Sequence, residues 1–509
     1  MNEKFLIIPT VLLSAIGCSA KQEQKPNVII ILADDLGYGD VSAYGNTTIS
    51  TPNIDKLANG GVCFNNGYAT SATSTPSRYA LFTGMYPWKN KRAKILPGDA
   101  PLIIDENQPT LPKMMQHAGY ATAAIGKWHL GMGMGNIDWN QTITPNANSV
   151  GFDYSCLVAA TNDRVPTVYV ENGKVVGLET DDPIEVSYKQ NFPGEPTALT
   201  NPEMLRMRWH HGHNQSIVNG IPRIGFMKGG QKARWIDEEM ADYFADKVKG
   251  FLHENKDKPF FLYYGLHQPH VPRTPNSRFV GATTMGPRGD AIVEADWCVG
   301  ALLAELENLD ILDNTLVIFS SDNGPVLQDG YYDDCTEKVG EHQPAGGLRG
   351  GKYSLFDGGT RVPFFVYWRG TIKPMVSDAL VCHLDLFASI GKLIHAHVPA
   401  ELDSKEILSA LMGKNKKGRS DLVLEAQGKL AFRSGNYALI PPYKGPKSNI
   451  TGNELGNLEE LSLFDLKSDF GQVINIADKS PALTKKLLSD FLNITEGYYK
   501  PEVKEVELK

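Results

Sequence analysis

The chain has 509 residues, of which 42% are hydrophobic and 21% are charged, a composition typical of a globular protein. This length allows one large domain together with one or two smaller ones. The formal net charge of −8 argues against nucleic acid as the main partner. An anionic substrate stays open, because a local cationic pocket can coexist with an acidic surface.

The first twenty residues have the pattern of an export signal. A lysine at position 4 precedes an apolar run over residues 5–16, which is shorter than the ~20 residues that a membrane-spanning helix needs. Gly17-Cys18 resembles a bacterial lipoprotein box, in which Cys18 becomes the lipidated first residue. Plain secretion with cleavage near Ala20 is the alternative. Both interpretations predict export, to the periplasm or as an outer-membrane lipoprotein, with a lipid anchor as the only contact with a membrane.

Buried strands alternate with helical patterns over residues 25–412, which we expect to form one large domain. The predicted strands are residues 27–32, 120–125, 259–266, 315–320 and 362–368. The predicted helices are residues 53–58, 111–117, 237–253 and 290–309. Continuous apolar strands that alternate with helices favour an α/β fold whose sheet is covered by helices. The intervening residues 130–235 are less regular and are expected to form a long excursion over the edge of the sheet.

The composition changes at residues 413–421, where the sequence GKNKKGRSD is charged and lacks a periodic pattern. Short alternating stretches follow, and residues 480–492 have the pattern of a terminal helix. Residues 421–509 are therefore predicted to form a small antiparallel α+β subdomain.

Acidic pairs follow two of the predicted strands. Asp34-Asp35 comes after the first strand, and Asp322-Asn323 follows residues 315–320. The carboxyl ends of parallel strands meet at one edge of a sheet, where ligands commonly bind. Four oxygen donors from two strand ends suit a hard divalent cation such as Ca²⁺ or Mg²⁺. The alternative is that each pair only caps a helix or forms an Asx-turn.

Cationic residues occur at other strand ends. GKWHLG places Lys127 and His129 after one strand, and LHQPH places His267 and His270 after another. Lys352 lies in a glycine-rich loop that is not a P-loop, because tyrosine follows the lysine. Together with a metal, these residues describe a pocket suited to a tetrahedral oxyanion ester, whose hydrolysis needs charge stabilisation and an acid for the leaving alcohol.

The stretch STPSRYALFTG, residues 74–84, places a serine before a helix start. Pro76 suits the first turn of a helix, so Ser74 falls at its N-terminus. There the backbone N–H groups and the helix dipole favour negative charge, as a nucleophile acting on a sulfuryl or phosphoryl group requires. A plain N-cap role for Ser74 is equally compatible with the sequence.

Ser74-Thr75-Pro76-Ser77-Arg78, with Leu81 and Thr83-Gly84, resembles the signature of the type I, formylglycine-dependent sulfatases in its serine-type bacterial form, similar to arylsulfatase A. Further matching motifs follow in order, and the resemblance covers nearly all of the mature chain. They are ADDLGYGD (33–40), GKWHLG (126–131), LHQPH (266–270), SSDNG (320–324), GGLRGGKYSLFDGGTRVP (346–363) and a C-terminal stretch at 461–477. The resemblance implies the alkaline-phosphatase-like α/β fold, a mixed sheet sandwiched by helices, with a smaller C-terminal antiparallel α+β subdomain.

The resemblance also implies that an anaerobic sulfatase-maturing enzyme oxidises Ser74 to formylglycine (3-oxoalanine). The hydrated aldehyde carries two hydroxyl groups on one carbon. One attacks sulfur, and deprotonation of the other then expels sulfate and regenerates the aldehyde. A bare serine would instead form a sulfate ester that is hard to break.

The family's site residues carry over to matching positions. Asp34, Asp35, Asp322 and Asn323, with the residue-74 hydroxyl, correspond to ligands of Ca²⁺, with Mg²⁺ as the less favoured ion. Arg78 corresponds to the arginine that holds the hydrate, and His129 to the histidine near it. Lys127, His267 and Lys352 correspond to residues that grip sulfate, and either His267 or Lys352 would protonate the leaving oxygen. Weaker candidates for substrate contacts are Thr161, Asn162, Asp163 and Arg164. The Trp209–His213 stretch could line a sugar subsite or be an ordinary surface loop.

These observations predict an exported sulfuric ester hydrolase that acts on a sulfated carbohydrate. Its substrate is expected to be a mucin- or glycosaminoglycan-type glycan with sulfated galactose or N-acetylgalactosamine. Two alternatives stay open: a phosphate or phosphonate monoester hydrolase of the same superfamily, and a non-catalytic glycan-binding lipoprotein.

Overall fold

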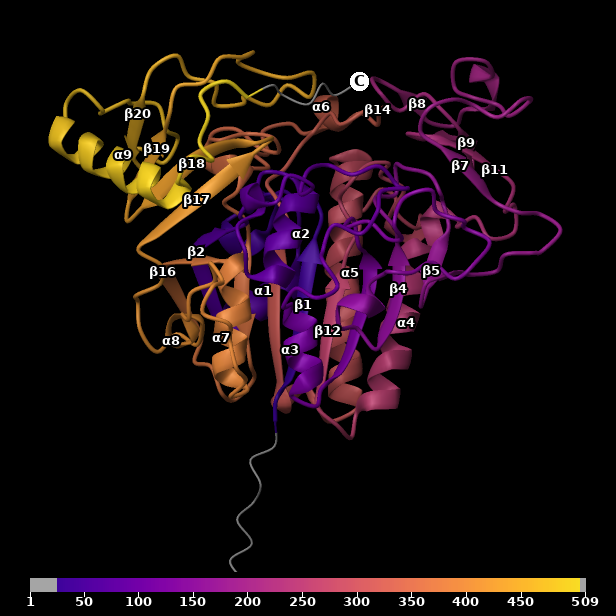
Figure 1. Ribbon diagram of the computed structural model, residues 1–509, viewed down its shortest axis with the longest axis horizontal. Helices are drawn as coiled ribbons and strands as arrows, with labels where there is room; N and C mark the ends of the chain where they lie inside the picture. The colour runs from indigo at the N-terminus through magenta and orange to yellow at the C-terminus, as the bar shows by residue number, and fades with distance from the viewer. Residues whose placement is uncertain (1–24, 504–509) are drawn as a thin grey trace, which may run out of the picture.

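The first described strand is β1 (Asn27–Ala33), whose seven residues are all buried, as its continuous apolar sequence predicts. The computed structural model describes residues 25–503, so the predicted export signal and Cys18 lie outside the described part of the chain. Within that part, no helix combines the length and the apolar character needed to cross a membrane. β1 lies in the middle of a ten-stranded sheet (Figure 1).

The main sheet is mixed, and its five central strands are parallel. β1 pairs in parallel with two neighbours, β12 and β13, whereas β15 runs antiparallel to both strands beside it. The carboxyl ends of the parallel strands therefore meet at one edge, where the predicted site residues follow them. In order across the sheet the strands are β16 (Met375–Cys382), β2 (Val62–Tyr68), β15 (Phe364–Tyr367), β13 (Thr315–Ser321), β1, β12 (Phe260–Gly265), β3 (Ala121–Lys127), β4 (Tyr154–Val158), β5 (Tyr169–Glu171) and β6 (Lys174–Val175).

Helices cover both faces of this sheet and create two separate apolar cores. Leu57, Phe244 and Leu303 belong to one core, from α1 (Pro52–Gly60), α4 (Met240–Asn255) and α5 (Gly286–Asn308). Phe82 and Phe387 belong to the other, together with residues of three further helices. These are α2 (Ser74–Thr83), α3 (Leu111–His117) and α7 (Leu386–Leu393), and the short helices α6 (Cys335–Lys338) and α8 (Leu408–Leu411) complete this part of the chain.

Small two-stranded ribbons extend beyond the edge of the sheet formed by β4, β5 and β6 (Figure 1). They come mostly from the predicted excursion, although one includes a strand from farther along the chain. The ribbons are β7 (Glu185–Ser187) with β11 (Phe226–Lys228), β9 (Ile217–Val218) with β10 (Ile221–Pro222), and β8 (Arg208–Trp209) with β14 (Tyr331–Tyr332).

The C-terminal region forms a separate four-stranded antiparallel sheet. It lies near the end of the main domain that carries α2 (Figure 1). A terminal helix packs on it through residues such as Leu487 and Phe491. The elements are β17 (Asp421–Ala426), β18 (Lys429–Ser434), β19 (Tyr437–Ile440), β20 (Ser462–Asp465) and α9 (Pro481–Thr495).

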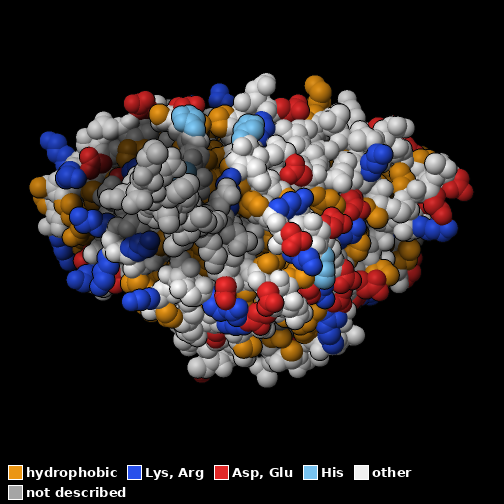
Figure 2. All heavy atoms as spheres, turned by 90° about the horizontal axis from the view of Figure 1, so that it is seen from below, with side chains coloured by type: hydrophobic (Ala, Val, Ile, Leu, Met, Phe, Trp, Pro, Cys, Tyr) orange, Lys and Arg blue, Asp and Glu red, His pale blue; other side chains and the backbone are white. Residues whose placement is uncertain are grey.

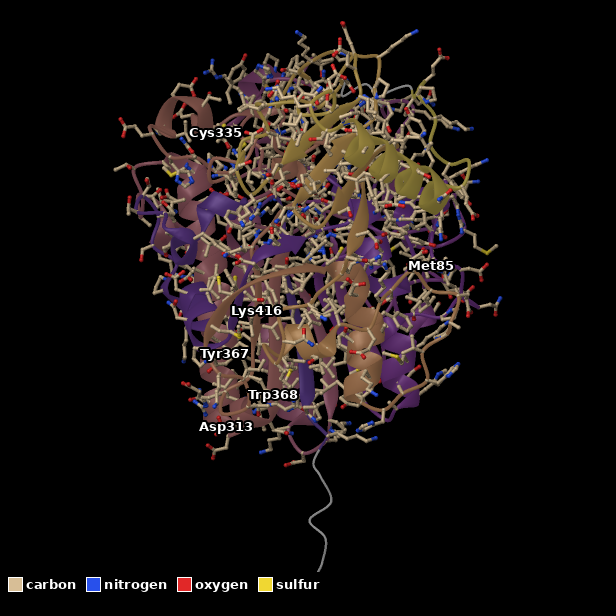
Figure 3. All side chains as sticks on the ribbon, turned by 90° about the vertical axis from the view of Figure 1, so that its left-hand side faces the viewer. Met85, Asp313, Cys335, Tyr367, Trp368 and Lys416 are labelled. Atoms are coloured by element: carbon tan, nitrogen blue, oxygen red, sulfur yellow. The ribbon has the colours of Figure 1, made fainter. Side chains whose placement is uncertain are left out.

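The two ends of the main sheet differ. Figure 3 shows Asp313, Tyr367 and Trp368 near the lower end, where Trp368 Nε1 donates a hydrogen bond to the Asp313 carbonyl at 2.9 Å. Cys335 lies near the opposite, upper end in the same view. Seen from below, the described part of the surface carries both acidic and basic side chains (Figure 2).

The predicted α/β fold with a small antiparallel C-terminal subdomain is confirmed. Every predicted strand and helix is present, with ends that shift by a few residues. Five strands of the main sheet were not predicted: β2 and β16 at one edge, and β4, β5 and β6, which come from the excursion, at the other. β2 has the sequence VCFNNGY, whose polar and glycine residues interrupt the apolar run that marks a buried strand.

Candidate active site

An acidic cluster, defined as Asp34, Asp35, Asp322 and Asn323, lies at the carboxyl ends of β1 and β13. The register pairs the last residues of these parallel strands, so that the side chains that follow them meet. Asn323 Nδ2 donates to Asp35 Oδ1 at 2.7 Å, and the Asp35 backbone N–H donates to Asp322 Oδ1 at 3.3 Å. All four side chains are buried. The two acidic pairs therefore form one site rather than separate caps.

Ser74 is the first residue of α2, and its hydroxyl faces the acidic cluster. Ser74 Oγ lies 3.3 Å from Asp34 Oδ1 and 3.4 Å from Asn323 Oδ1. Lys127 Nζ donates to the same oxygen at 2.9 Å. The N-cap position is taken by Thr73, which has extended backbone angles. The N-cap thus lies one residue before Ser74, and the interpretation of Ser74 as a plain N-cap is wrong. The Ser74 side chain is available to the acidic cluster.

The loop before α2, residues 69–73, is held from two sides. Its outer side pairs with the end of β17: Ala72 N donates to the Glu425 carbonyl at 2.8 Å, and Glu425 N donates to the Thr70 carbonyl at 3.0 Å. The Ser71 hydroxyl donates to the buried Glu425 carboxylate. On the other side, Tyr353 N donates to the Ala72 carbonyl at 2.9 Å. The C-terminal sheet thus fixes the backbone that presents Ser74.

Two buried cations pair with the inner carboxylates of the cluster. Arg78 directs Nε and Nη2 at Asp322 Oδ2, at 3.0 and 2.7 Å. Lys127 Nζ lies 2.6 Å from Asp34 Oδ2 and 3.7 Å from Asp322 Oδ2. Because Arg78 lies one helical turn after Ser74 on α2, the same helix carries the hydroxyl and a counter-charge.

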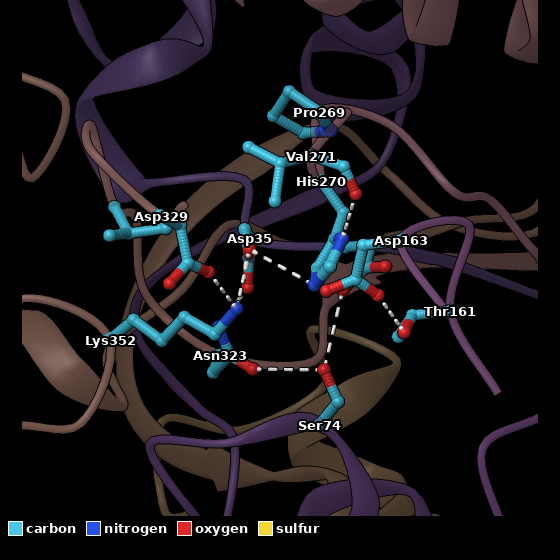
Figure 4. Close-up of polar contacts among 12 residues, drawn as sticks. Asp35, Ser74, Thr161, Asp163, Pro269, His270, Val271, Asn323, Asp329 and Lys352 are labelled. Atoms are coloured by element: carbon cyan, nitrogen blue, oxygen red, sulfur yellow. Dashed lines mark hydrogen bonds and ion pairs between the residues drawn. The ribbon is translucent and has the colours of Figure 1, made fainter. Parts of the chain in front are cut away.

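A third cation closes the other side of the cluster. Lys352 Nζ lies 2.8 Å from both Asp35 Oδ2 and Asp329 Oδ2 (Figure 4). Tyr353 OH donates to the second oxygen of Asp329 at 3.2 Å. Asp329 was not predicted as a site residue, because it lies in a loop with no recognisable motif. Its position is set by Lys352 and Tyr353, which are 23 and 24 residues farther along the chain.

The acidic cluster holds an excess of negative charge. Burial raises the pKa of Asp34 well above its usual range; Lys127 opposes this rise, while Asp322 and Asp35 add to it. Burial also acts to raise the pKa of Asp322, but Arg78 and Lys127 outweigh it, and this pKa is lowered. With Asp329 included, four buried carboxylates face three buried cations. A bound divalent cation would turn the one excess negative charge into one excess positive charge, which an anionic substrate group could offset.

The donor set fits a hard divalent cation. Ligand atoms of Asp34, Asp35 and His270 lie within 4.8 Å of one another. The amide oxygen of Asn323 and Ser74 Oγ point to the same region, as their 3.4 Å separation shows. Carboxylate, amide and hydroxyl oxygens are the ligands that Ca²⁺ and Mg²⁺ prefer. These residues could therefore hold the cation that the sequence predicts.

Three histidines from the predicted motifs are buried, but only two of them line the cavity over Ser74. His270 lines the cavity over Ser74, with Nε2 3.9 Å from Asp35 Oδ2 and Nδ1 2.6 Å from the Val271 carbonyl oxygen (Figure 4). His129 also lines it; its Nε2 lies 3.1 Å from the Leu96 carbonyl, and its buried Nδ1 has no partner among the described residues. Burial lowers the pKa of His129 well below the usual range, and Lys127 adds to this, so that its imidazole is neutral.

His267, the predicted sulfate-binding histidine, is buried but is not among the residues that line this cavity. Burial lowers its pKa to about 4, an effect that Asp237 opposes. The sequence HQPH offers two histidines on either side of one proline, and only the backbone path of the turn decides which one reaches the cavity. Here His270 does so, and its role was left open by the sequence.

A cavity of about 230 Å³ opens over Ser74. A larger one, of about 880 Å³, lies beside α3 and α7 and includes neither Ser74 nor Lys352, so size alone does not mark the site. The residues that line the cavity over Ser74 are Thr73, Ser74, Ile95, His129, Asp163, Arg164, His211, His213, Ile224, His270, Asp329, Lys352 and Tyr353.

The weaker substrate candidates divide into two groups. Asp163 and Arg164 line the cavity, and Arg164 Nη1 donates to Asp163 Oδ1 at 2.7 Å. Thr161 donates its hydroxyl to Asp163 (Figure 4), and Asn162 donates Nδ2 to the Pro272 carbonyl at 3.2 Å. The last two residues do not line the cavity and support it from behind. His213, from the predicted His-rich stretch, lies at the cavity and pairs with Asp163 at 2.8 Å.

Residues 26–396 match the family model for sulfatases. An N-acetylgalactosamine-6-O-sulfatase of Bacteroides thetaiotaomicron is 47% identical over 92% of this chain and 94% of its own length. Bovine arylsulfatase A is 31% identical, over 91% of this chain and 86% of its own. A solved structure described with the metabolism of multiple glycosaminoglycans by Bacteroides thetaiotaomicron has a TM-score of 0.91 and 46% identity, covering 93% of this chain and 100% of that one. The chain thus belongs to the sulfatase family and is a sulfuric ester hydrolase.

Proposed function

We propose that this enzyme removes the 6-O-sulfate of N-acetylgalactosamine in a glycosaminoglycan- or mucin-type glycan. The substrate is inferred from the relative described as an N-acetylgalactosamine-6-O-sulfatase, which is 47% identical over nearly the full length of both chains. The observation that carries the chemistry is the position of Ser74 Oγ, which contacts Asp34, Asn323 and Lys127 at once. Residue 74 therefore lies where an attacking oxygen, a metal and a sulfate group would meet.

Ser74 is proposed to act as formylglycine. Among the described residues, no histidine lies within hydrogen-bonding distance of its hydroxyl, and the one side-chain nitrogen there belongs to Lys127, a donor in its charged form. The unmodified serine thus lacks the histidine base of a serine hydrolase. A formylglycine hydrate supplies two hydroxyl groups on one carbon, so that the second can expel sulfate. The proposed maturing partner is an anaerobic sulfatase-maturing enzyme.

The proposed metal is Ca²⁺, held by the acidic cluster and residue 74. When bound, it supplies positive charge beside the attacking oxygen and the sulfate. The chain's own residues keep this region dry and ordered: Arg78 is buried beneath residue 74 and bridges Asp322 to Tyr263. Their burial strengthens each electrostatic contact with a bound anion.

Lys352 is proposed to protonate the leaving sugar oxygen. The sequence left this role open between His267 and Lys352, and Lys352 is the one that lines the cavity. Its ammonium group has three N–H donors. Asp35 and Asp329 accept two of them, which leaves one to donate toward the cavity. Lys127, on the other side of Ser74, is proposed to hold a non-bridging sulfate oxygen.

The enzyme is also proposed to be exported, to the periplasm or as an outer-membrane lipoprotein. The support is the N-terminal pattern alone, an apolar run over residues 5–16 that ends in Gly17-Cys18. Labelling with a radioactive fatty acid tests the lipid, with Cys18→Ser as the matched variant. Labelled wild type and unlabelled variant are expected; export of an unlabelled wild type would support plain secretion instead.

The function is tested with protein produced together with the maturing enzyme. Mass spectrometry of the peptide around residue 74 should show formylglycine. A panel of 6-sulfated N-acetylgalactosamine, 4-sulfated N-acetylgalactosamine, 6-sulfated galactose and 6-sulfated N-acetylglucosamine should give the highest kcat/KM for the first. An aryl phosphate measured beside an aryl sulfate tests the phosphatase alternative. A preference for phosphate, or full activity with an unmodified Ser74, would contradict the proposal.

A further inference from the structure

We propose that His211 binds a hydroxyl group of the sugar ring and selects the sugar that enters the cavity. The proposal rests on the proposed function, because it concerns the sugar carrying the sulfate. His211 belongs to the histidine loop, residues 210–213. This loop follows β8 and reaches the wall of the cavity over Ser74. This loop lies outside every motif that identified the family.

His211 presents an unengaged ring nitrogen. Its Nδ1 lies 2.8 Å from His210 Nδ1, whereas its Nε2 forms no hydrogen bond with another described residue. The ring lines the cavity and is 8% exposed. A mostly buried polar atom at a cavity surface, without a protein partner, is placed to bind a polar group of a ligand.

The pair of Nδ1 atoms makes His211 suited to a hydroxyl group. A short contact between two imidazole nitrogens requires one to be protonated and the other to accept. If His211 carries the Nδ1 proton, its Nε2 accepts from the cavity; if His210 carries it, His211 Nε2 donates. A sugar hydroxyl both donates and accepts, so either arrangement gives a hydrogen bond. Burial lowers the pKa of His211 to about 4, although Asp329 opposes this, so that its imidazole is neutral near pH 7.

The position of His211 is fixed through its neighbour His213. His213 Nδ1 bonds the His211 carbonyl at 2.8 Å, and His213 Nε2 bonds Asp163 Oδ2 at 2.8 Å. Gly330, next to Asp329, packs directly on this ring: a Cβ at Gly330 would lie 1.9 Å from His213 Nδ1. The histidine loop, Asp163 and the 329–330 turn therefore hold one another in place. Such support is what a specificity contact requires.

The charges in the cavity place the sugar on this side. Lys127 and Lys352 lie at Ser74 and attract the sulfate. Asp163 and the neutral His211 lie at the cavity wall formed by the excursion, where Arg164 and His213 pair with the Asp163 carboxylate, so that this wall offers hydrogen-bonding groups to sugar hydroxyls. A cavity of about 230 Å³ is smaller than the ~300–1,000 Å³ of pockets for drug-sized ligands, so it suits a single sugar residue.

The experiment compares a sulfated sugar with a sulfate that has no sugar. His211→Ala, His211→Gln and wild type are assayed on 6-sulfated N-acetylgalactosamine and on an aryl sulfate, and their melting temperatures are recorded. His253→Ala, a change at an exposed histidine on α4, is the matched control. We expect His211→Ala to lower kcat/KM about tenfold on the sugar and to leave the aryl sulfate within about twofold. His211→Gln, which can place an amide near the Nε2 position, should recover part of the loss.

Each other outcome overturns the proposal. An equal loss on both substrates would mean that His211 acts through the fold or the chemistry. No loss on the sugar, with a folded variant, would mean that it does not contact the substrate. Failure of the proposed function gives a different result. The wild type would then cleave another sulfated sugar of the panel, and the His211 variants would be tested on that sugar. A wild type that cleaves aryl sulfate but no sulfated sugar would contradict both.

Discussion

The cavity has two walls of different construction. The inner wall presents Ser74 and Lys352 to the cavity and is backed by the buried acidic cluster, Arg78 and Lys127. The outer wall consists of Asp163, Arg164, His211, His213 and Asp329. Most of the inner wall follows the ends of central strands or starts α2, so the apolar cores on both faces of the sheet fix its geometry. The outer wall comes from loops and two-residue ribbons. The core thus fixes most of the reacting groups, whereas the outer loops, which can vary more freely, are proposed to select the substrate; Asp329 belongs to both, because it also pairs with Lys352.

The largest break of the inner wall is Ser74→Ala. This substitution should lower kcat/KM on both sugar sulfates and aryl sulfates by more than about 10³-fold, because no attacking oxygen remains. The melting temperature should change little, since a small hydroxyl is lost. Wild type produced without the maturing enzyme is the matched control and should be similarly inactive. Residual activity of the variant above about 10% would place the nucleophile elsewhere.

Removal of the metal should break the inner wall almost as severely. Dialysis against a calcium chelator is expected to lower kcat about 100-fold or more and to lower the melting temperature, because bound cation balances buried carboxylates and stabilises the folded state. Added Ca²⁺ should restore both values more fully than Mg²⁺. Elemental analysis before and after dialysis checks the loss of metal. Activity that persists in metal-free protein would contradict the assignment of the acidic cluster.

Glu425→Ala should loosen the inner wall from outside the main domain. It removes the acceptor of the Ser71 hydroxyl and of Gly428 N, so the loop that presents Ser74 gains freedom. We expect kcat/KM to fall about tenfold on sugar and aryl sulfates alike. Glu425→Gln keeps one acceptor oxygen and should lose less. A selective loss on the sugar alone would mean that this residue belongs with the outer wall.

Gly330→Ala should displace residues of the outer wall and leave the inner wall in place. The added methyl group would collide with His213, and the glycine has φ +107°, a conformation that other residues rarely adopt. Several-fold lower kcat/KM on the sugar is expected, with aryl sulfate hydrolysis retained. Gly340→Ala, at another positive-φ glycine but with open space around it, is the control for backbone strain. Equal losses in the two variants would indicate strain rather than displacement of His213.

The smallest expected effect concerns the buried carboxyl group of Glu294 on α5. Burial raises the pKa of Glu294 to about 7, although its bonds from Asn276 N and Gln268 oppose the rise. A carboxyl whose folded pKa is raised binds its proton more tightly in the folded state, so stability falls as pH rises from about 4.5 toward 7. Glu294→Gln should flatten this part of the melting-temperature profile. An unchanged slope between pH 5 and 8 would contradict the raised pKa.

The inner wall could be predicted from the sequence because its residues follow strands that are easy to recognise. A parallel sheet brings the ends of such strands together whatever the loops do, so Asp34 and Asp322 were expected to meet before their distance was known. The N-terminus of α2 was predicted within one residue from Pro76. What periodicity could not supply was the side chain orientation after each strand, which decides between His267 and His270.

The outer wall could not be predicted in the same way. Its contacts join segments with no periodic pattern: His213 meets Asp163 across 50 residues, and Lys352 meets Asp329 across 23. Each contact depends on the path of a loop, which side-chain chemistry alone does not determine. The His-rich stretch was noticed as a candidate subsite, yet its composition fits an ordinary surface loop equally well. Only the positions of the loops that carry Asp163 and Asp329 show that the His-rich stretch lines the cavity.

The pairing of the loop before Ser74 with β17 has a consequence for the order of folding. Ser71 and Glu425 are 354 residues apart, so this part of the site stays incomplete until most of the chain has been made. Contacts that close such a long loop form late, because their entropic cost is met only after the intervening structure has condensed. In the folded protein Ser74 is 4% exposed and every residue of α2 is buried. The interval before this closure is therefore when the proposed maturing enzyme would have access to Ser74.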